Sequence, residues 1–141
     1  MRTRTLAQMA GFLQEKFLAV MATTRQDGTP LLSPVWYEYA DGVFWVVINQ
    51  GDAKDRHLRR RPWLTLVIAE QAFPYRGVEA AGKAALRDDG ALEATTRMAH
   101  RYLTREAARS YLAKTTDIPV RLVQLRPERI RAWDFLDFAN P

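Results

Sequence analysis

The sequence predicts a mainly β protein with helices (α+β), in which six antiparallel strands close into a barrel within a single domain, residues 1–141. Two Asp-Gly pairs join three apolar segments near the start, and two more apolar segments follow a short basic one. Helical periodicity occurs only outside these apolar segments. Tight turns join successive strands in antiparallel order, and a closed sheet leaves no exposed edge, so these observations favour a barrel over an open sheet.

The first half of the chain predicts a helix and then a three-stranded meander. Apolar residues recur at helical spacing between residues 5 and 15. Compact apolar runs follow, and the turn signals Asp27-Gly28 and Asp41-Gly42 separate them. We therefore expect strands over 17–25, 30–40 and 43–49.

The second half predicts two further strands and, after a helical region, a last one. The two strands cover 63–71 and 76–87. Gly82, inside the second of them, suggests a bulge or a close approach by another backbone or a ligand. The last strand, over 118–135, is interrupted near Pro127, because proline donates no hydrogen bond to a sheet.

Residues 91–113 have helical character. One face of the predicted helix carries Leu92, Thr96, Ala99 and Leu103. Thr104 is a suitable N-cap for a second, shorter helix that continues through Leu112.

The stretch "GDAKDRHLRRRP" (51–62) concentrates positive charge in a short predicted helix over 53–61. Asp52 is a good N-cap, and Asp55 three residues later comes close to a capping box. Pro62 ends the helix.

Two interpretations of this charge remain open. Lys54 and Arg56 lie in the first turn, where free N–H groups favour an anion, so they form a candidate phosphate site. Arg56 also shares a helix face with Arg59 and Arg60, which fits a solvated basic surface. The residues alone slightly favour the solvated surface.

Several chemistries are excluded by what the sequence lacks. It has no cysteine, and so no disulfide, thiol nucleophile or thiolate metal site. His57 and His100 are the only histidines, and no His/carboxylate cluster has metal-ligand spacing. Neither common glycine-rich nucleotide loop is present. The net charge of +5 favours an anionic partner without identifying it.

No targeting or membrane segment is predicted. The first residues have no long apolar core and no small-residue cleavage pattern. The apolar runs are far shorter than the ~20 residues of a membrane helix. We therefore expect a cytoplasmic protein with no membrane partner.

Aromatic residues gather on the predicted strands 30–40 and 43–49, including Trp36 and Tyr37. Such residues most often fill a core or an oligomer interface, and the alternative is a flat wall for a planar ring. Pro34 indicates a bulge or a sheet edge, because it cannot donate to the ladder, and a groove can lie beside it.

Three stretches resemble, in order and spacing, the pyridoxamine 5′-phosphate oxidase-like family of FMN-binding split β-barrel proteins. They are "FLAVMATTRQDGTPLLSPVWYEYADGVFWV" (17–46), "KDRHLRRRPWLTLVI" (54–68) and "PYRGVEAAGKAAL" (74–86). The similarity is greatest to a small actinobacterial branch that uses FMN or coenzyme F-420. It covers most of the first two-thirds of the chain, and the rest fits the family's usual ending.

The resemblance implies a homodimer with cofactor sites at the subunit interface. It implies that the flavin or deazaflavin ring lies against the second and third strands. The positions that match ring and ribityl contacts are Ser33, Pro34, Val35 and Trp36. Asn49 matches a position near the ribityl–phosphate chain.

The resemblance also assigns charged residues. Lys54 and Arg56 match the family's Lys-x-Arg phosphate pair. Arg60, with the arginines on either side of it, would meet a polyglutamate tail if the cofactor is F-420, or would form a solvated face. Arg76 and Trp133 match contributions from the partner subunit.

The expected function is therefore that of an F-420- or FMN-dependent oxidoreductase, which transfers a hydride to or from a small planar substrate. The cofactor would carry the hydride chemistry, and no catalytic acid or base is assigned. One alternative is a non-catalytic flavin or haem binder on the same fold, with His57 or His100 as haem ligand. Another is a basic nucleic-acid-binding barrel, which is disfavoured because the strand aromatics are mixed into apolar runs.

Overall fold

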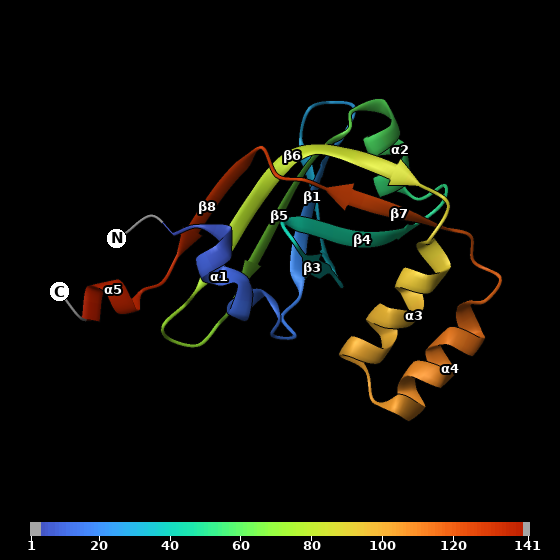
Figure 1. The fold of residues 1–141 in the computed structure, drawn as a ribbon. Coiled ribbons are helices and arrows are strands. Elements are labelled where there is room, and N and C mark those ends of the chain that lie inside the picture. Colours follow the sequence, from blue (N-terminus) through green and yellow to red (C-terminus); the bar gives the residue numbers. More distant parts are fainter. Residues whose placement is uncertain (1–3, 140–141) are drawn as a thin grey trace.

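The computed structural model describes residues 4–139 and consists of one curled antiparallel sheet with helices around it (Figure 1). The strands are β1 (Ala19–Thr24), β2 (Pro30–Val35), β3 (Glu38–Ala40), β4 (Val43–Asn49), β5 (Trp63–Ala69), β6 (Gly77–Arg87), β7 (Val120–Leu125) and β8 (Arg129–Trp133). The helices are α1 (Leu6–Leu13), α2 (Ala53–Arg60), α3 (Ala91–Tyr102), α4 (Arg105–Thr115) and α5 (Leu136–Ala139). The predicted α+β class and antiparallel split barrel are confirmed.

Strand β6 connects the two parts of the sheet. The strand order is β2-β1-β5-β6-β7-β4-β3, with β8 also paired to β6. One edge of β6 pairs with β5, and the other pairs first with β8 and then, further along, with β7. The long β6 therefore belongs to both parts of the split barrel.

The predicted strand over 30–40 divides in two, so the three-stranded meander does not form. β2 pairs with β1, whereas β3 pairs with β4. At the break, the Tyr102 hydroxyl lies 3.3 Å from both the N and the O of Tyr37, and it donates to Phe17 O at 2.8 Å. Tyr102 therefore partners the backbone of Tyr37 where no neighbouring strand can.

The strand predicted over 118–135 also divides, at Pro127, which explains why the sheet has eight strands and not six. Glu128 N then donates to Ala81 O at 2.8 Å. A Cβ atom on Gly82 would lie 3.0 Å from Glu128 N and 3.2 Å from Arg126 O. Gly82 is thus required by the close approach of another backbone, one of the two predicted reasons.

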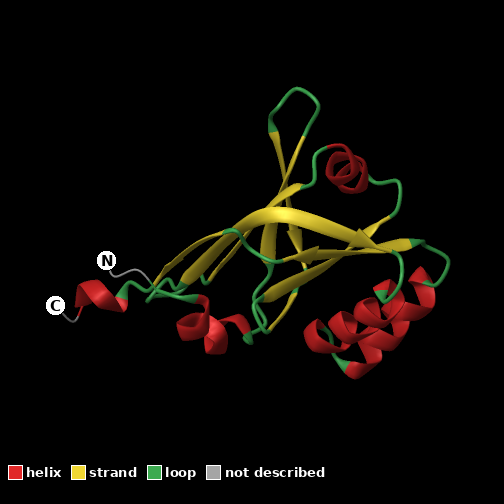
Figure 2. Cartoon of the chain, turned by 45° about the horizontal axis from the view of Figure 1, so that its top comes forward, coloured by secondary structure: helices red, strands yellow, loops and turns green. Residues whose placement is uncertain are grey.

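Strand β4 is covered on both faces, which explains its nearly continuous apolar sequence. Phe44, Val46 and Ile48 point into the main core with residues of α1, β1, β5 and β6. Trp45 and Val47 point to the other face and join a second cluster with α3. Helices α3 and α4 lie together at one end of the sheet, whereas α1 and α5 lie at the other (Figure 2).

The N-cap predicted for the second helix is confirmed, because Thr104 Oγ1 accepts from Ala107 N at 3.2 Å. The face of α3 singled out in the sequence is only partly packed, because it includes Ala99, which is fully buried, as well as Leu92. Ala91, Ala94 and Met98 are buried against the sheet, whereas Leu92 is 63% exposed. Small alanines allow the helix to approach the sheet closely, and this leaves the Leu92–Thr96 face turned outward.

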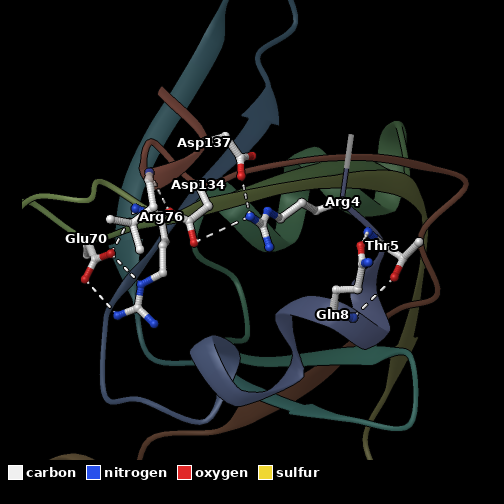
Figure 3. A network of polar contacts seen from close by, with 8 residues as sticks. Arg4, Thr5, Gln8, Glu70, Arg76, Asp134 and Asp137 are labelled. Carbon is white, nitrogen blue, oxygen red and sulfur yellow. Dashed lines mark hydrogen bonds and ion pairs between the residues drawn. The ribbon is translucent and has the colours of Figure 1, made fainter. Parts of the chain in front are cut away.

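Helix α1 begins with a capping box that the sequence analysis did not identify. Thr5 Oγ1 accepts from Gln8 N at 3.2 Å, and Gln8 Oε1 accepts from Thr5 N at 2.9 Å (Figure 3). Arg4 donates to Asp137 Oδ1 at 2.7 Å and so joins the start of the described chain to its last helix. No helix within residues 4–139 has the length and apolar character needed to span a membrane.

The crossing at Gly82 gives a first prediction. Gly82→Ala should lower the free energy of unfolding by about 1–3 kcal/mol, since a methyl group would press on backbone atoms that cannot move freely. The matched control is Gly11→Ala in α1, where nothing lies within 4 Å of the added Cβ. That change should be neutral or stabilising by up to about 1 kcal/mol. Urea denaturation of both variants checks this, and equal effects would contradict the backbone crossing.

Candidate functional site

A cavity of about 340 Å³ opens where the ends of β2 and β4 meet helices α2, α3 and α4. Five of the predicted site residues line it: Pro34, Val35, Trp36, Asn49 and Lys54. β2 supplies the first two, and Trp36 follows at the strand break. Asn49 is the last residue of β4, and Lys54 lies in the first turn of α2. Residues from three segments of the sequence are therefore brought to one place.

Trp36 has a fixed environment at the wall of this cavity. Its ring stacks on Tyr102 of α3, with centroids 5.5 Å apart and planes 6° apart. The ring of Tyr111, on α4, lies 5.1 Å away at a tilt of 57°. Trp36 therefore packs against two helices and also lines the cavity, and its role as a wall for a planar ring stays a prediction.

The N-terminus of α2 is fixed by Asp55 and not by the predicted cap. The Asp52 side chain makes no capping hydrogen bond to the helix. Asp55, which is fully buried, instead accepts from Gly51 N at 2.8 Å. The predicted capping box therefore does not form, because Asp55 binds the backbone N–H of Gly51, one residue before Asp52, while Asp52 N donates to Asn49 O at 3.3 Å.

Asp55 also binds two arginines. Arg121 Nε of β7 donates to Asp55 Oδ1 at 2.8 Å, and Arg59 Nε lies 3.5 Å from the same oxygen. Arg121 continues to Asp88 Oδ1 at 2.6 Å. Burial alone would raise the pKa of Asp55, but the hydrogen bonds from Gly51 and Arg121 outweigh it and hold the pKa below its usual value. Asp55 is therefore ionised and joins α2 to β7.

The other four predicted residues are placed outside the cavity lining. Ser33 pairs with Met21 across β1 and β2. Arg56 Nη1 donates to Gly51 O at 2.7 Å, and Arg60 Nη2 donates to Thr24 O at 2.9 Å. Two of the basic side chains thus hydrogen-bond to nearby backbone. A cofactor role for these residues stays a prediction.

Arg76 lies near α1, in a separate network of polar contacts (Figure 3). Its guanidinium forms two hydrogen bonds with Glu70, at 2.6 and 2.9 Å, and an ion pair with Glu15 at 3.1 Å. It also lies over the ring of Phe12 at 5.0 Å. Hydrogen bonding to Glu70 raises the pKa of Arg76, although burial acts in the opposite direction.

Tyr37, on the predicted aromatic strand, lies outside the cavity lining. Its ring is fully buried, and its hydroxyl donates to Leu13 O at 2.9 Å. Burial raises the pKa of Tyr37 above its ordinary value. Among the tyrosines of residues 4–139, only Tyr111 lines the cavity.

His57 lies on the buried face of α2, outside the cavity lining. Its Nδ1 is 3.0 Å from the hydroxyl of Thr23, which is also buried. Burial lowers the pKa of His57, and the nearby Arg60, Arg56 and Arg25 lower it further. The ring is therefore neutral near pH 7 and serves as a packed hydrogen-bonding group.

The remaining walls of the cavity were not identified from the sequence. Val47 and Val120 come from β4 and β7, and Thr95, Met98 and Tyr111 come from the helix pair. Their participation depends on how α3 and α4 pack against the sheet. A periodic pattern within one helix gives no information about that packing.

The lining can hold a flat organic molecule with an anionic group. Its walls are mainly aliphatic or aromatic, and Lys54 and Asp52 supply the charges. An anionic group would therefore lie beside Lys54 and away from Asp52. Among residues 4–139, no group of three His, Asp or Glu side chains has an arrangement that could hold a metal ion.

A known protein family matches nearly the whole chain. The sequence profile described as pyridoxamine 5′-phosphate oxidase matches residues 5–134. No curated protein matches the chain.

Solved structures share the fold. One is a conserved hypothetical protein, Rv2991, from Mycobacterium tuberculosis, with 23% identity, a TM-score of 0.77, and coverage of 100% of this chain and 94% of that one. A protein named F420 reductase has 18% identity and a TM-score of 0.68 over 85% and 93% of the two chains. An FAD-binding protein from Mesorhizobium loti has 20% identity and a TM-score of 0.64 over 93% of each chain.

The Asp55–Arg121 pair gives a second prediction. Asp55→Asn should lower the free energy of unfolding by about 3 kcal/mol at pH 7, because it leaves buried donors without their charged partner. The control is Asp89→Asn, which breaks the exposed pair with Arg87 and should cost less than about 1 kcal/mol.

Acid should remove the same contribution. The folded-state pKa of Asp55 lies below the unfolded value, so its stabilisation is present above pH ~4 and is lost as the pH falls below that. Urea denaturation measured from pH 7 to pH 3 should therefore show the free energies of unfolding of the parent and of Asp55→Asn converging. A constant difference across that range would contradict an ionised Asp55.

A third prediction concerns His57. Since its folded-state pKa is lowered, the unfolded chain takes up a proton first as the pH falls below ~6.5, and the protein should lose stability toward pH 5. The slope due to one histidine is at most about 1.4 kcal/mol per pH unit. In His57→Gln this slope should be reduced. The exposed His100→Gln variant should keep it, and the same slope in all three proteins would refute the assignment.

Proposed function

The chain belongs to the pyridoxamine 5′-phosphate oxidase family, and from that premise we propose that it binds FMN or coenzyme F-420 and acts as an oxidoreductase on a small planar substrate. The observation that supports this most directly is the cavity, whose apolar walls end at Lys54 on the first turn of α2. Two of the similar structures carry names that refer to such cofactors, an F420 reductase and an FAD-binding protein.

The groups that line the cavity fit a cofactor of this kind. A flavin or deazaflavin ring needs flat apolar walls, which Pro34, Val35 and Val47 provide. Its phosphate needs a cation or free N–H groups, and Lys54 lies on a helix turn that no Asp52 side chain caps. Asn49, which also lines the cavity, offers an amide to the hydroxyls of a ribityl chain.

When bound, the cofactor supplies the hydride chemistry. The contribution of the chain is binding, orientation and exclusion of water. Trp36 is held by Tyr102 and Tyr111, so the wall that it forms is rigid before any ligand arrives. The ion pair of Asp55 with Arg121 fixes α2, so Lys54 holds its place at the end of β4.

A homodimer would complete this site. Three exposed apolar residues lie close to one another in the sheet: Leu18 just before β1, Val20 on β1 and Leu32 on β2. Leu32 is 62% exposed. Leu18 belongs both to this exposed surface and to the lining of the cavity. A second copy packed on this surface would cover apolar side chains and close the cavity from one side.

The alternatives receive less support from the geometry. His57 and His100 do not line the cavity, so neither is placed to coordinate a haem there. Tyr37 and Phe44 are fully buried and offer no surface on which nucleic-acid bases could stack. A flavin carrier without catalysis would use the same cavity, and turnover measurements on the loaded protein separate it from an enzyme.

The fourth prediction tests the phosphate position. Lys54→Met should weaken FMN binding by about 2 kcal/mol, or roughly 30-fold, because a charge-assisted hydrogen bond is lost. Riboflavin has the same ring and ribityl chain without the phosphate, so its affinity should be unchanged. Lys83→Met, on the exposed side of β6, is the control for net charge and should bind FMN normally.

Fluorescence titration gives all these dissociation constants. Equal loss of FMN and riboflavin binding would mean that Lys54 shapes the cavity without contacting a phosphate. No change for either ligand would place the phosphate elsewhere and remove the main support for the proposed orientation.

A further inference from the structure

A second cavity, of about 370 Å³, lies between α3 and α4 beside the start of β7. It adjoins the cavity described above, and four residues line both: Asn49, Thr95, Tyr111 and Val120. We call this second cavity the α3–α4 groove. Its volume falls within the range of small-molecule sites.

The lining of the α3–α4 groove is uncharged. Its side chains are aliphatic, aromatic, amide or hydroxyl groups: Asn49, Leu92, Thr95, Thr96, Tyr111, Leu112, Thr115, Thr116, Ile118 and Val120. No Lys, Arg, Asp or Glu of the described chain lines it. This contrasts with the neighbouring cavity, which has Lys54 and Asp52. A charged ligand would gain no counter-ion here and would lose hydration, so the groove favours a neutral molecule.

The threonines of the groove share a hydrogen-bonding state. Each donates its hydroxyl proton to the carbonyl four residues earlier: Thr95 to Ala91 at 2.8 Å, Thr96 to Leu92 at 3.1 Å, Thr115 to Tyr111 at 2.9 Å and Thr116 to Leu112 at 2.9 Å. A hydroxyl that has donated its only proton can still accept through its lone pairs. The helices therefore present acceptors to a ligand that carries N–H or O–H donors.

Two apolar residues of the groove remain partly exposed to solvent. Leu92 is 63% exposed and Ile118 is 39% exposed, although the other face of α3 is tightly buried. Covering such side chains is favourable by roughly 25 cal/mol per Å² of apolar surface removed from water. A bound molecule with an apolar body would provide that cover.

We propose that the α3–α4 groove binds the organic reactant, an uncharged molecule with an apolar body and an N–H donor. This inference rests on the proposed function, because it takes the adjoining cavity to hold the cofactor. Tyr111 and Asn49 stand at the boundary of the two cavities, and Tyr111 contacts Trp36. A molecule in the groove thus has its inner end against the wall where the cofactor ring is proposed to lie.

Three matched probes test this. Indole is neutral and planar and has one N–H donor; 1-methylindole lacks the donor; indole-3-acetate adds a negative charge. Each is titrated into the ¹⁵N-labelled protein, with and without FMN, and the amide shifts are followed by NMR. We expect indole to shift amides of α3, α4 and the 116–120 segment, and to bind about fivefold more tightly than either other probe.

Two variants and a control locate the site. Thr115→Val removes one acceptor that lines only the groove, and should weaken indole about fivefold without changing 1-methylindole. Leu92→Trp fills the groove from its exposed rim and should abolish binding of both. Ser110 lies on α4 outside the groove lining, so Ser110→Ala should change the affinity for neither indole nor 1-methylindole. All three variants should retain the FMN affinity of the parent.

The outcomes separate the two proposals. Indole shifts elsewhere, equal affinity for all three probes, or no effect of Thr115→Val would overturn the groove as a reactant site. If FMN binds while indole does not, this inference fails and the proposed function stands. If indole binds in the groove while FMN and F-420 do not bind at all, both the reactant role and the proposed function are refuted.

Discussion

The buried carboxylate of Asp55 is the interaction on which the site depends. A charge removed from water must be paired, and Asp55 is paired with Arg121 of β7 and with the backbone of Gly51. Gly51 follows the end of β4 and Arg121 lies at the start of β7, so these bonds join the start of α2 to two strands of the sheet. The rest of α2 is mostly basic and polar, with His57 and Leu58 as its other buried side chains. Asp55 is thus the charged one of three buried side chains that hold α2, and with it Lys54, beside the end of β4.

The second constraint is the covering of β4 on both faces. Its inward side chains complete the main core, and its outward ones support α3. Helix α3 approaches the sheet closely through small alanines, and α4 packs against α3. This arrangement leaves a charged cavity at the end of β4 and an uncharged groove next to it. The two kinds of lining are consistent with two different ligands meeting at Tyr111 and Asn49.

Local signals in the sequence predicted most of the elements. The Asp-Gly turns, the Thr104 cap and the close approach at Gly82 each depend on neighbouring residues or on backbone geometry. The division of the strand at Trp36 could not be predicted, because it depends on the hydroxyl of Tyr102, which is far away in the sequence. The sequence places Leu92 and Ala99 on one face of α3, but helical periodicity does not say which of them is buried, and only Ala99 is.

The candidate site was predicted in the same partial way. Local signals indicated Lys54 at the start of α2 and a groove beside Pro34, whereas Val35 and Asn49 were assigned only through the family resemblance. The walls from α3 and α4 could not, because they require the packing of a helix pair on the sheet. The pairing of Asp55 with Arg121 joins residues from different halves of the chain. The one sign of this pairing in the sequence is that Asp55 is the single carboxylate within the basic helix α2.

The most direct test of the account is a titration of the purified protein with FMN and with F-420, followed by fluorescence, together with sedimentation of the loaded protein. We expect saturable binding of at least one of them, with one cofactor per chain in a dimer. Binding of neither would contradict the central claim that the cavity beside Lys54 is a cofactor site.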